Sequence, residues 1–149
     1  MGALSNQEAA NGWTDELVID WEDFSTANIG TIADDATYTF TYTIPLGSVV
    51  HNCGAELITA FDDSGGGAQL NVIVGDGDDD NGYLTTAALH TDQTEITKVV
   101  NTGALLATGS KAYAAADTIA IKFSIAGASY TVNELTAGRV AFRFTILSV

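Results

Sequence analysis

The sequence predicts an all-β fold: a single-domain antiparallel β-sandwich, of jelly-roll or related Greek-key topology, with about eight strands. Hydrophobic side chains recur at every second position in segment after segment, as expected for strands with one buried face. These segments are short and are separated by clusters of Gly, Asn, Asp and Ser, which favour turns. No long amphipathic helical pattern competes with this interpretation.

Each predicted strand is marked by alternating side chains. The positions that share one face are Leu17, Ile19 and Trp21; Tyr38, Phe40, Tyr42 and Ile44; Leu57, Thr59 and Phe61; Leu70, Val72 and Val74; Ile119, Ile121, Phe123 and Ile125; and Val140, Phe142, Phe144 and Ile146. The clearest is TYTFTYTI, in which four threonines alternate strictly with aromatic or aliphatic residues. Thr85 to His90 is the best helix candidate, of one or two turns.

The domain prediction is a flexible N-terminal arm over residues 1–12, followed by the β-sandwich over residues 13–149. At 149 residues, of which 46% are hydrophobic, the chain is long enough to bury its own core. Pro45 separates two strands.

The net charge of -14 excludes several partners. A surface this acidic repels nucleic acid and anionic membranes, so we expect it to bind neither. The charge is also uneven: residues 1–97 contain 17 Asp and Glu and no Lys or Arg, whereas residues 98–149 contain all five cations and two acids. Either strands from the two halves interleave and neutralise each other, or the cations mark a docking face.

Two catalytic motifs are suggested by the segment from Phe61 to Leu84, and both fail. Asp63-Ser64-Gly65-Gly66 matches a serine-protease nucleophile turn, but His51 is the nearest upstream histidine and the chain is too short for a double-barrel protease. The glycines that follow Ser64 lack the Gly-Lys-Ser/Thr of a phosphate loop and lie among aspartates. We interpret this stretch as a turn.

The same segment contains a candidate calcium site. Asp76, Asp78 and Asp80 occupy alternate positions, as in positions one, three and five of a calcium loop, and Asp62 or Asp63 could add a ligand. The loop lacks the EF-hand glycine at position six and the acid at position twelve. A non-EF calcium site and a solvated acidic loop both remain open.

The remaining candidate ligands and nucleophiles form weak sets. They are His51 with Cys53, His90 with Asp92, and an aromatic sugar-binding face of Trp13, Trp21 and Tyr83. The single cysteine excludes an intrachain disulfide, and we expect Cys53 to be a buried apolar residue, because a reactive thiolate needs an electropositive site. No acid, base and nucleophile converge, so the sequence predicts a protein that is not an enzyme.

Lys122, Arg139 and Arg143 are the candidate contact residues. Lys122 and Arg143 take the polar phase of alternating strands and therefore point away from the core. If their strands are neighbours, one outer face carries much of the cationic charge and could contact an acidic partner or another subunit. Ordinary solvated strand residues are the alternative.

The order of segments between Leu57 and Phe144 resembles small structural virion proteins of tailed, especially marine, bacteriophages. The segments are LITAFDDSGGG, LNVIVGDGDDDNGYLTTAALH, TEITKVVNTGALL, AYAAADTIAIKFS and LTAGRVAFRF. Such proteins are often called head decoration or cement proteins. The likeness is one of pattern and carries no catalytic residues.

The resemblance implies a jelly-roll module on the outer surface of the virion head, made in the host cytoplasm. Its partners would be the major capsid protein and itself, as a homotrimer whose weak contacts are multiplied by avidity. Its function would be to bridge capsomers and stabilise the expanded shell. A tail, neck or fibre-associated module and a host-surface carbohydrate-binding module are the alternatives.

Overall fold

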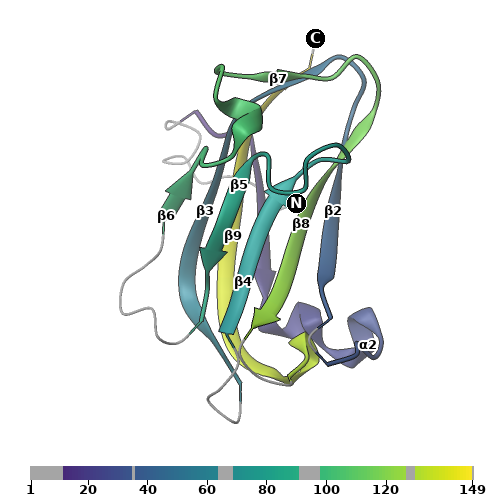
Figure 1. The fold of residues 1–149 in the computed structure, drawn as a ribbon, viewed down its shortest axis with the longest axis vertical. Coiled ribbons are helices and arrows are strands. Elements are labelled where there is room, and N and C mark those ends of the chain that lie inside the picture. The colour runs from purple at the N-terminus through teal and green to yellow at the C-terminus, as the bar shows by residue number, and fades with distance from the viewer. Residues whose placement is uncertain (1–11, 35, 64–68, 91–97, 127–129, 149) are drawn as a thin grey trace.

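The computed structural model describes residues 12–34, 36–63, 69–90, 98–126 and 130–148, and these form two antiparallel sheets packed face to face (Figure 1). The predicted all-β sandwich is confirmed. The predicted N-terminal arm lies outside the described residues except for Gly12.

Nine strands are present in the described part of the chain. The first sheet contains β1 (Asp15–Asp20), β9 (Leu135–Ser148), β3 (Ser48–Asp63) and β6 (Lys98–Val100) in that order, with the short β7 (Lys111–Ala112) also paired with β3. The second sheet contains β2 (Tyr38–Ile44), β8 (Asp117–Ala126), β4 (Gln69–Gly75) and β5 (Leu84–Ala88).

This strand order is that of a jelly roll. The chain pairs as a long antiparallel ribbon, β1 with β9, β2 with β8, β3 with β6 and β7, and β4 with β5. Rolling the ribbon adds the pairs β3 with β9 and β4 with β8, which complete the two sheets. The sequence had left a jelly roll and a related Greek key open, and the observed order selects the jelly roll.

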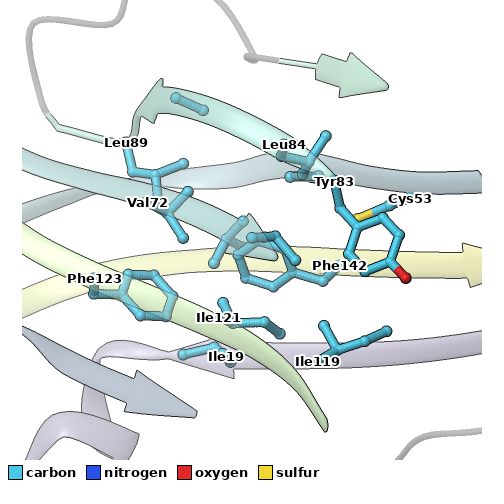
Figure 2. Close-up of a cluster of buried hydrophobic side chains, with 14 of the residues drawn as sticks. Ile19, Cys53, Val72, Tyr83, Leu84, Leu89, Ile119, Ile121, Phe123 and Phe142 are labelled. Carbon is cyan, nitrogen blue, oxygen red and sulfur yellow. The ribbon is translucent and has the colours of Figure 1, made fainter. Parts of the chain in front are cut away.

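Side chains from the two sheets meet in one core. In Figure 2, Val72 from β4 and Ile119, Ile121 and Phe123 from β8 lie in the same layer as Phe142 from β9. All of these are at most 1% exposed, which confirms the alternation predicted for β4, β8 and β9. On β8 and β9 the residues between them include Lys122 and Arg143, which are only partly buried.

The long connection between β1 and β2 closes one end of the sandwich. It contains a 3-10 helix, η1 (Trp21–Phe24), and the short α2 (Thr26–Ile29), which Figure 1 shows beside the start of β2. Phe24 is fully buried and makes edge-to-face ring contacts with Phe40 and Phe123, at centroid distances of 5.4 and 5.0 Å.

Asn133, from the 3-10 helix η3 (Val132–Glu134), fixes this connection. Its amide nitrogen donates to the carbonyls of Phe24 and Gly30, at 2.6 and 3.2 Å, and its oxygen accepts from the backbone N–H of Ile32 at 3.0 Å. One side chain therefore supplies hydrogen-bond partners for three backbone groups of this connection.

Two expectations about local structure were wrong. Thr85 to His90 is not a helix, because β5 covers Leu84–Ala88 and buries Leu84 and Ala87 against the core. Burial on a sheet overrides the helix propensity of its alanine and leucine residues. Thr59 does not share the buried face of Leu57 and Phe61, since register shifts on both sides of Thr59 turn it to solvent.

Candidate functional site

The acidic loop after β4 is organised around Asp76, which is buried although it is charged. Its Oδ1 accepts hydrogen bonds from the backbone N–H groups of Asp78 and Asp79, at 3.1 and 3.0 Å. The N–H of Asp76 donates in turn to the carbonyl of Asp79 at 2.9 Å. Asp76 therefore folds the loop back on itself, as aspartates do in tight turns.

Close backbone contact explains the glycines that border this loop. A Cβ atom on Gly75 would lie 1.9 Å from the carbonyl oxygen of Asp79, and one on Gly103 would lie 2.2 Å from that of Gly82. No side chain can occupy either position while the loop keeps this path. The glycines serve packing here, whereas residues 64–68, which include the triple glycine of the rejected motifs, lie outside the described residues.

Two buried tyrosines complete the cluster around Asp76. The hydroxyl of Tyr113 donates to Asp76 Oδ2 at 2.8 Å and is also hydrogen-bonded to the hydroxyl of Tyr83. Lys111 Nζ lies 3.7 Å from the same carboxylate oxygen and 5.6 Å from the centre of the Tyr113 ring. We call Asp76, Tyr83, Tyr113 and Lys111 the tyrosine–aspartate cluster.

The environment keeps these tyrosines protonated. Burial raises the pKa of Tyr83, and burial together with the hydrogen bonds to Tyr83 and Asp76 raises the pKa of Tyr113. Both hydroxyls therefore act as hydrogen-bond donors at neutral pH rather than as nucleophiles or bases. The cluster links the β7 turn to the loop after β4 and holds one end of the sandwich together.

Sequence reasoning missed this cluster. It named Tyr83 only as one member of a weak candidate sugar-binding face, with a place in the core as the commoner alternative, and Tyr83 is fully buried. Tyr113 lies in an alanine-rich segment, residues 112–116, which has no amphipathic period to mark it. The one available signal was a lone aromatic residue among alanines, two positions after Lys111.

Calcium binding by Asp76, Asp78 and Asp80 remains a prediction. Asp76 is already bonded to the loop backbone and to Tyr113, and Asp80 lies 3.1 Å from Lys122 Nζ. Asp78 is exposed. Within the described residues, no three His, Cys, Asp or Glu side chains are grouped so that they could hold a metal ion.

The candidate contact residues do not share one face. Lys122 lies on β8 and Arg139 and Arg143 lie on β9, and these strands belong to different sheets. The condition for one cationic outer face, that the strands of Lys122 and Arg143 are neighbours, is therefore not met. Each residue pairs with a carboxylate: Lys122 with Asp80, Arg139 with Asp20 at 4.0 Å, and Arg143 with Glu16 and Glu56.

Arg143 is the most enclosed of the three. Its Nε lies 2.8 Å from Glu16 and its Nη1 lies 2.6 Å from Glu56, and its side chain is 16% exposed. Glu16 comes from β1 and Glu56 from β3, so the guanidinium on β9 spans three adjacent strands. Arg139, at 54% exposure, remains the most accessible to a partner.

The structure does not assemble a site from the other candidate residues that it describes. Cys53 is buried as expected, and burial raises its pKa well above the ordinary value, which keeps the thiol protonated. A register shift at His51 marks it as the extra residue of a bulge. Trp13 covers Gly54, where a Cβ atom would lie 3.0 Å from the Trp13 ring, and Asp92 lies outside the described residues.

Comparison with known proteins gives one distant structural likeness. No protein-family model and no curated protein sequence matches this chain. A chain in the acidic stable capsid structure of Helicobacter pylori bacteriophage KHP30 is similar with a TM-score of 0.39 and 11% sequence identity. The match covers 91% of this chain and 98% of that chain.

Proposed function

We propose that the protein is a non-enzymatic structural protein of a bacteriophage virion, acting as a decoration or cement protein on the outer surface of the head. In this role it binds the major capsid protein, bridges neighbouring capsomers and stabilises the expanded shell. The segment order from Leu57 to Phe144, which resembles head decoration proteins, supports the assignment to virions.

The observation that carries the proposal is the arrangement of charge on a jelly-roll sandwich. Lys111, Lys122, Arg139 and Arg143 are each paired with a carboxylate of the same chain, while the net charge of the chain is -14. Such a surface is repelled by the packaged nucleic acid and suits a position outside the shell.

The buried polar groups support a structural role as well. The tyrosine–aspartate cluster and the Arg143 group both hold strands and loops together, and their acids and bases are hydrogen-bonded within the protein.

Binding to heads tests the proposal directly. Purified protein should cosediment with expanded heads that lack it and should raise the temperature at which those heads release their DNA. Binding to isolated tails but not to heads would favour the tail or neck alternative. Glycan binding with no affinity for heads would favour the carbohydrate-binding alternative, and either result would overturn the proposal.

A matched pair of substitutions tests which outer face meets the shell. Arg139→Glu changes the most exposed of the candidate contacts, and Lys122→Glu makes the same change of charge on the opposite sheet. We propose that β9 faces the shell, so Arg139→Glu should weaken head binding about tenfold or more, because avidity multiplies each lost contact. Lys122→Glu should leave it nearly unchanged.

A further inference from the structure

The edge strands of the two sheets differ in how well they are protected from pairing with another strand. An edge strand exposes a row of unpaired backbone N–H and C=O groups, and proteins block such edges with charge, shortness or bulges. Within the described residues the four edges are formed by β1, by β2, by β5 and by β6 together with the two-residue β7, which both pair with β3.

Three of these edges are protected. The sequence of β1 is DELVID, with three acids in six residues. β6 has three residues, and β5 has five and is paired with β4 through a register shift. Each therefore carries one of the usual devices that discourage pairing.

β2 carries none of them. Its sequence, YTFTYTI, has no charged residue and no proline, and all seven residues pair with β8 without a register shift. In the described part of the chain, no strand is hydrogen-bonded to its other edge, which Figure 1 shows at the flank of the sandwich.

The core face of β2 is also incompletely covered. Tyr38, Phe40 and Tyr42 are only half-buried, although the residues that they face on β8, such as Ile121, are fully buried. A further strand beside β2 would cover these rings in the way that β8 covers them on the inner side.

The pattern of β2 identifies what that strand would be. Around Thr41 the sequence reads nearly the same in both directions, so an antiparallel copy would place Thr39 opposite Thr43 and Phe40 opposite Tyr42. Threonine would meet threonine on the outer face and aromatic would meet aromatic on the core face, and both kinds of pair stabilise sheets. Two-fold interfaces require this kind of self-complementarity.

We propose that β2 is a self-association edge: two copies of the chain pair antiparallel about Thr41, which joins their second sheets into one continuous eight-stranded sheet. Since both copies are strongly acidic, their repulsion opposes the contact and salt should strengthen it. The inference stands independently of the proposed function and differs from the trimer that the resemblance implies.

Sedimentation velocity on the full chain, over a range of concentrations at low salt and at about 0.5 M salt, tests the proposal. We expect a dimer that strengthens with salt. Thr41→Lys should raise its dissociation constant about tenfold or more, because two like charges would lie directly opposite each other. This change lowers the net negative charge, so weaker association could not come from greater overall repulsion.

Two further measurements make the test specific to the pairing about Thr41. Thr86→Lys places the same charge on β5, an exposed position at the other edge of the same sheet, and should leave the dimer intact. Thr41→Glu should also disrupt the dimer, and mixing it with Thr41→Lys should restore association as a heterodimer. A chain that stays monomeric at high salt, a trimer, or a dimer that Thr41→Lys leaves unchanged would overturn the proposal.

Discussion

The tyrosine–aspartate cluster and the Arg143 group differ in which charge is central and in what they hold together. In the first, a fully buried carboxylate accepts from loop N–H groups and from Tyr113, which is 37 residues away along the chain. In the second, the guanidinium of Arg143, on a sheet face, bonds to both Glu16 and Glu56. Glu16 is 127 residues away from Arg143 along the chain. The first fixes a loop to an end of the sandwich, and the second fixes the order of three strands.

The two groups differ in burial, and burial decides how much stability is lost when one of their charged side chains is removed. Asp76 has no solvent to replace a lost partner, whereas Arg143 retains 16% exposure. Removing one member of a buried charged group leaves the others desolvated and unpaired, which costs more than removing an exposed pair.

Asp76→Ala should have the largest effect. It removes the acceptor for Tyr113 and for two backbone N–H groups, and we expect it to lower the free energy of unfolding by about 3–4 kcal/mol in urea denaturation. Asp78→Ala, at an exposed position of the same loop, should change it by at most about 0.5 kcal/mol. Equal losses in the two variants would contradict the central role of Asp76.

Arg143→Met should have the next largest effect. It keeps the apolar part of the side chain but brings Glu16 and Glu56 together without the guanidinium, and we expect a loss of about 2–3 kcal/mol. Lys122→Met, which breaks the more exposed pair with Asp80, should cost no more than about 0.5 kcal/mol. Adding Glu16→Gln and Glu56→Gln to Arg143→Met should recover part of the loss, and no recovery would show that charge is not the cause.

Alkaline pH should separate the two groups without mutation. The pKa values of Tyr83 and Tyr113 are raised in the folded protein above their ordinary value of 10.0, mainly by burial. The stability that they contribute is therefore fully present below about pH 10 and is lost as the pH rises further, because the unfolded chain ionises first. Denaturation curves at increasing pH should show this decline, and it should be smaller in Tyr113→Phe.

Calcium should have the smallest effect. Two of the three predicted ligands, Asp76 and Asp80, already have partners in the protein, so a weak site should raise the melting temperature by about 1–2 °C at most in millimolar calcium relative to EDTA. Asp78→Asn should abolish such a shift. Identical melting temperatures in calcium and EDTA would eliminate the calcium hypothesis.

Periodic patterns predicted the sandwich well, because burial of alternate residues on a strand is a local property of the sequence. Val72 and Phe123 are buried as expected, and β2 spans the strand with the strictest alternation. Strands from the two halves of the chain also lie side by side, so that cations of the second half neutralise acids of the first. Arg143 pairs with Glu16, and Lys122 pairs with Asp80.

The contacts that organise the candidate site could not be predicted in the same way. Spacing alone makes Asp76, Asp78 and Asp80 look equivalent, yet only Asp76 is buried, and Tyr113, 37 residues away just after β7, donates a hydrogen bond to it. Thr85 to His90 is the best helix candidate in the sequence for a similar reason, since the conformation of β5 is decided by its partner β4. Long-range pairing leaves no periodic trace in a single sequence.

The pairing of β1 with β9 has a consequence for synthesis in the cell. The strand partners of residues 15–20 are residues 139–144, so the first sheet cannot be completed until the segment that contains β9 has left the ribosome. During that interval the apolar faces of the early strands are exposed. Residues 1–97 contain 17 acids and no Lys or Arg, so we expect electrostatic repulsion between neighbouring unfinished copies to oppose their aggregation.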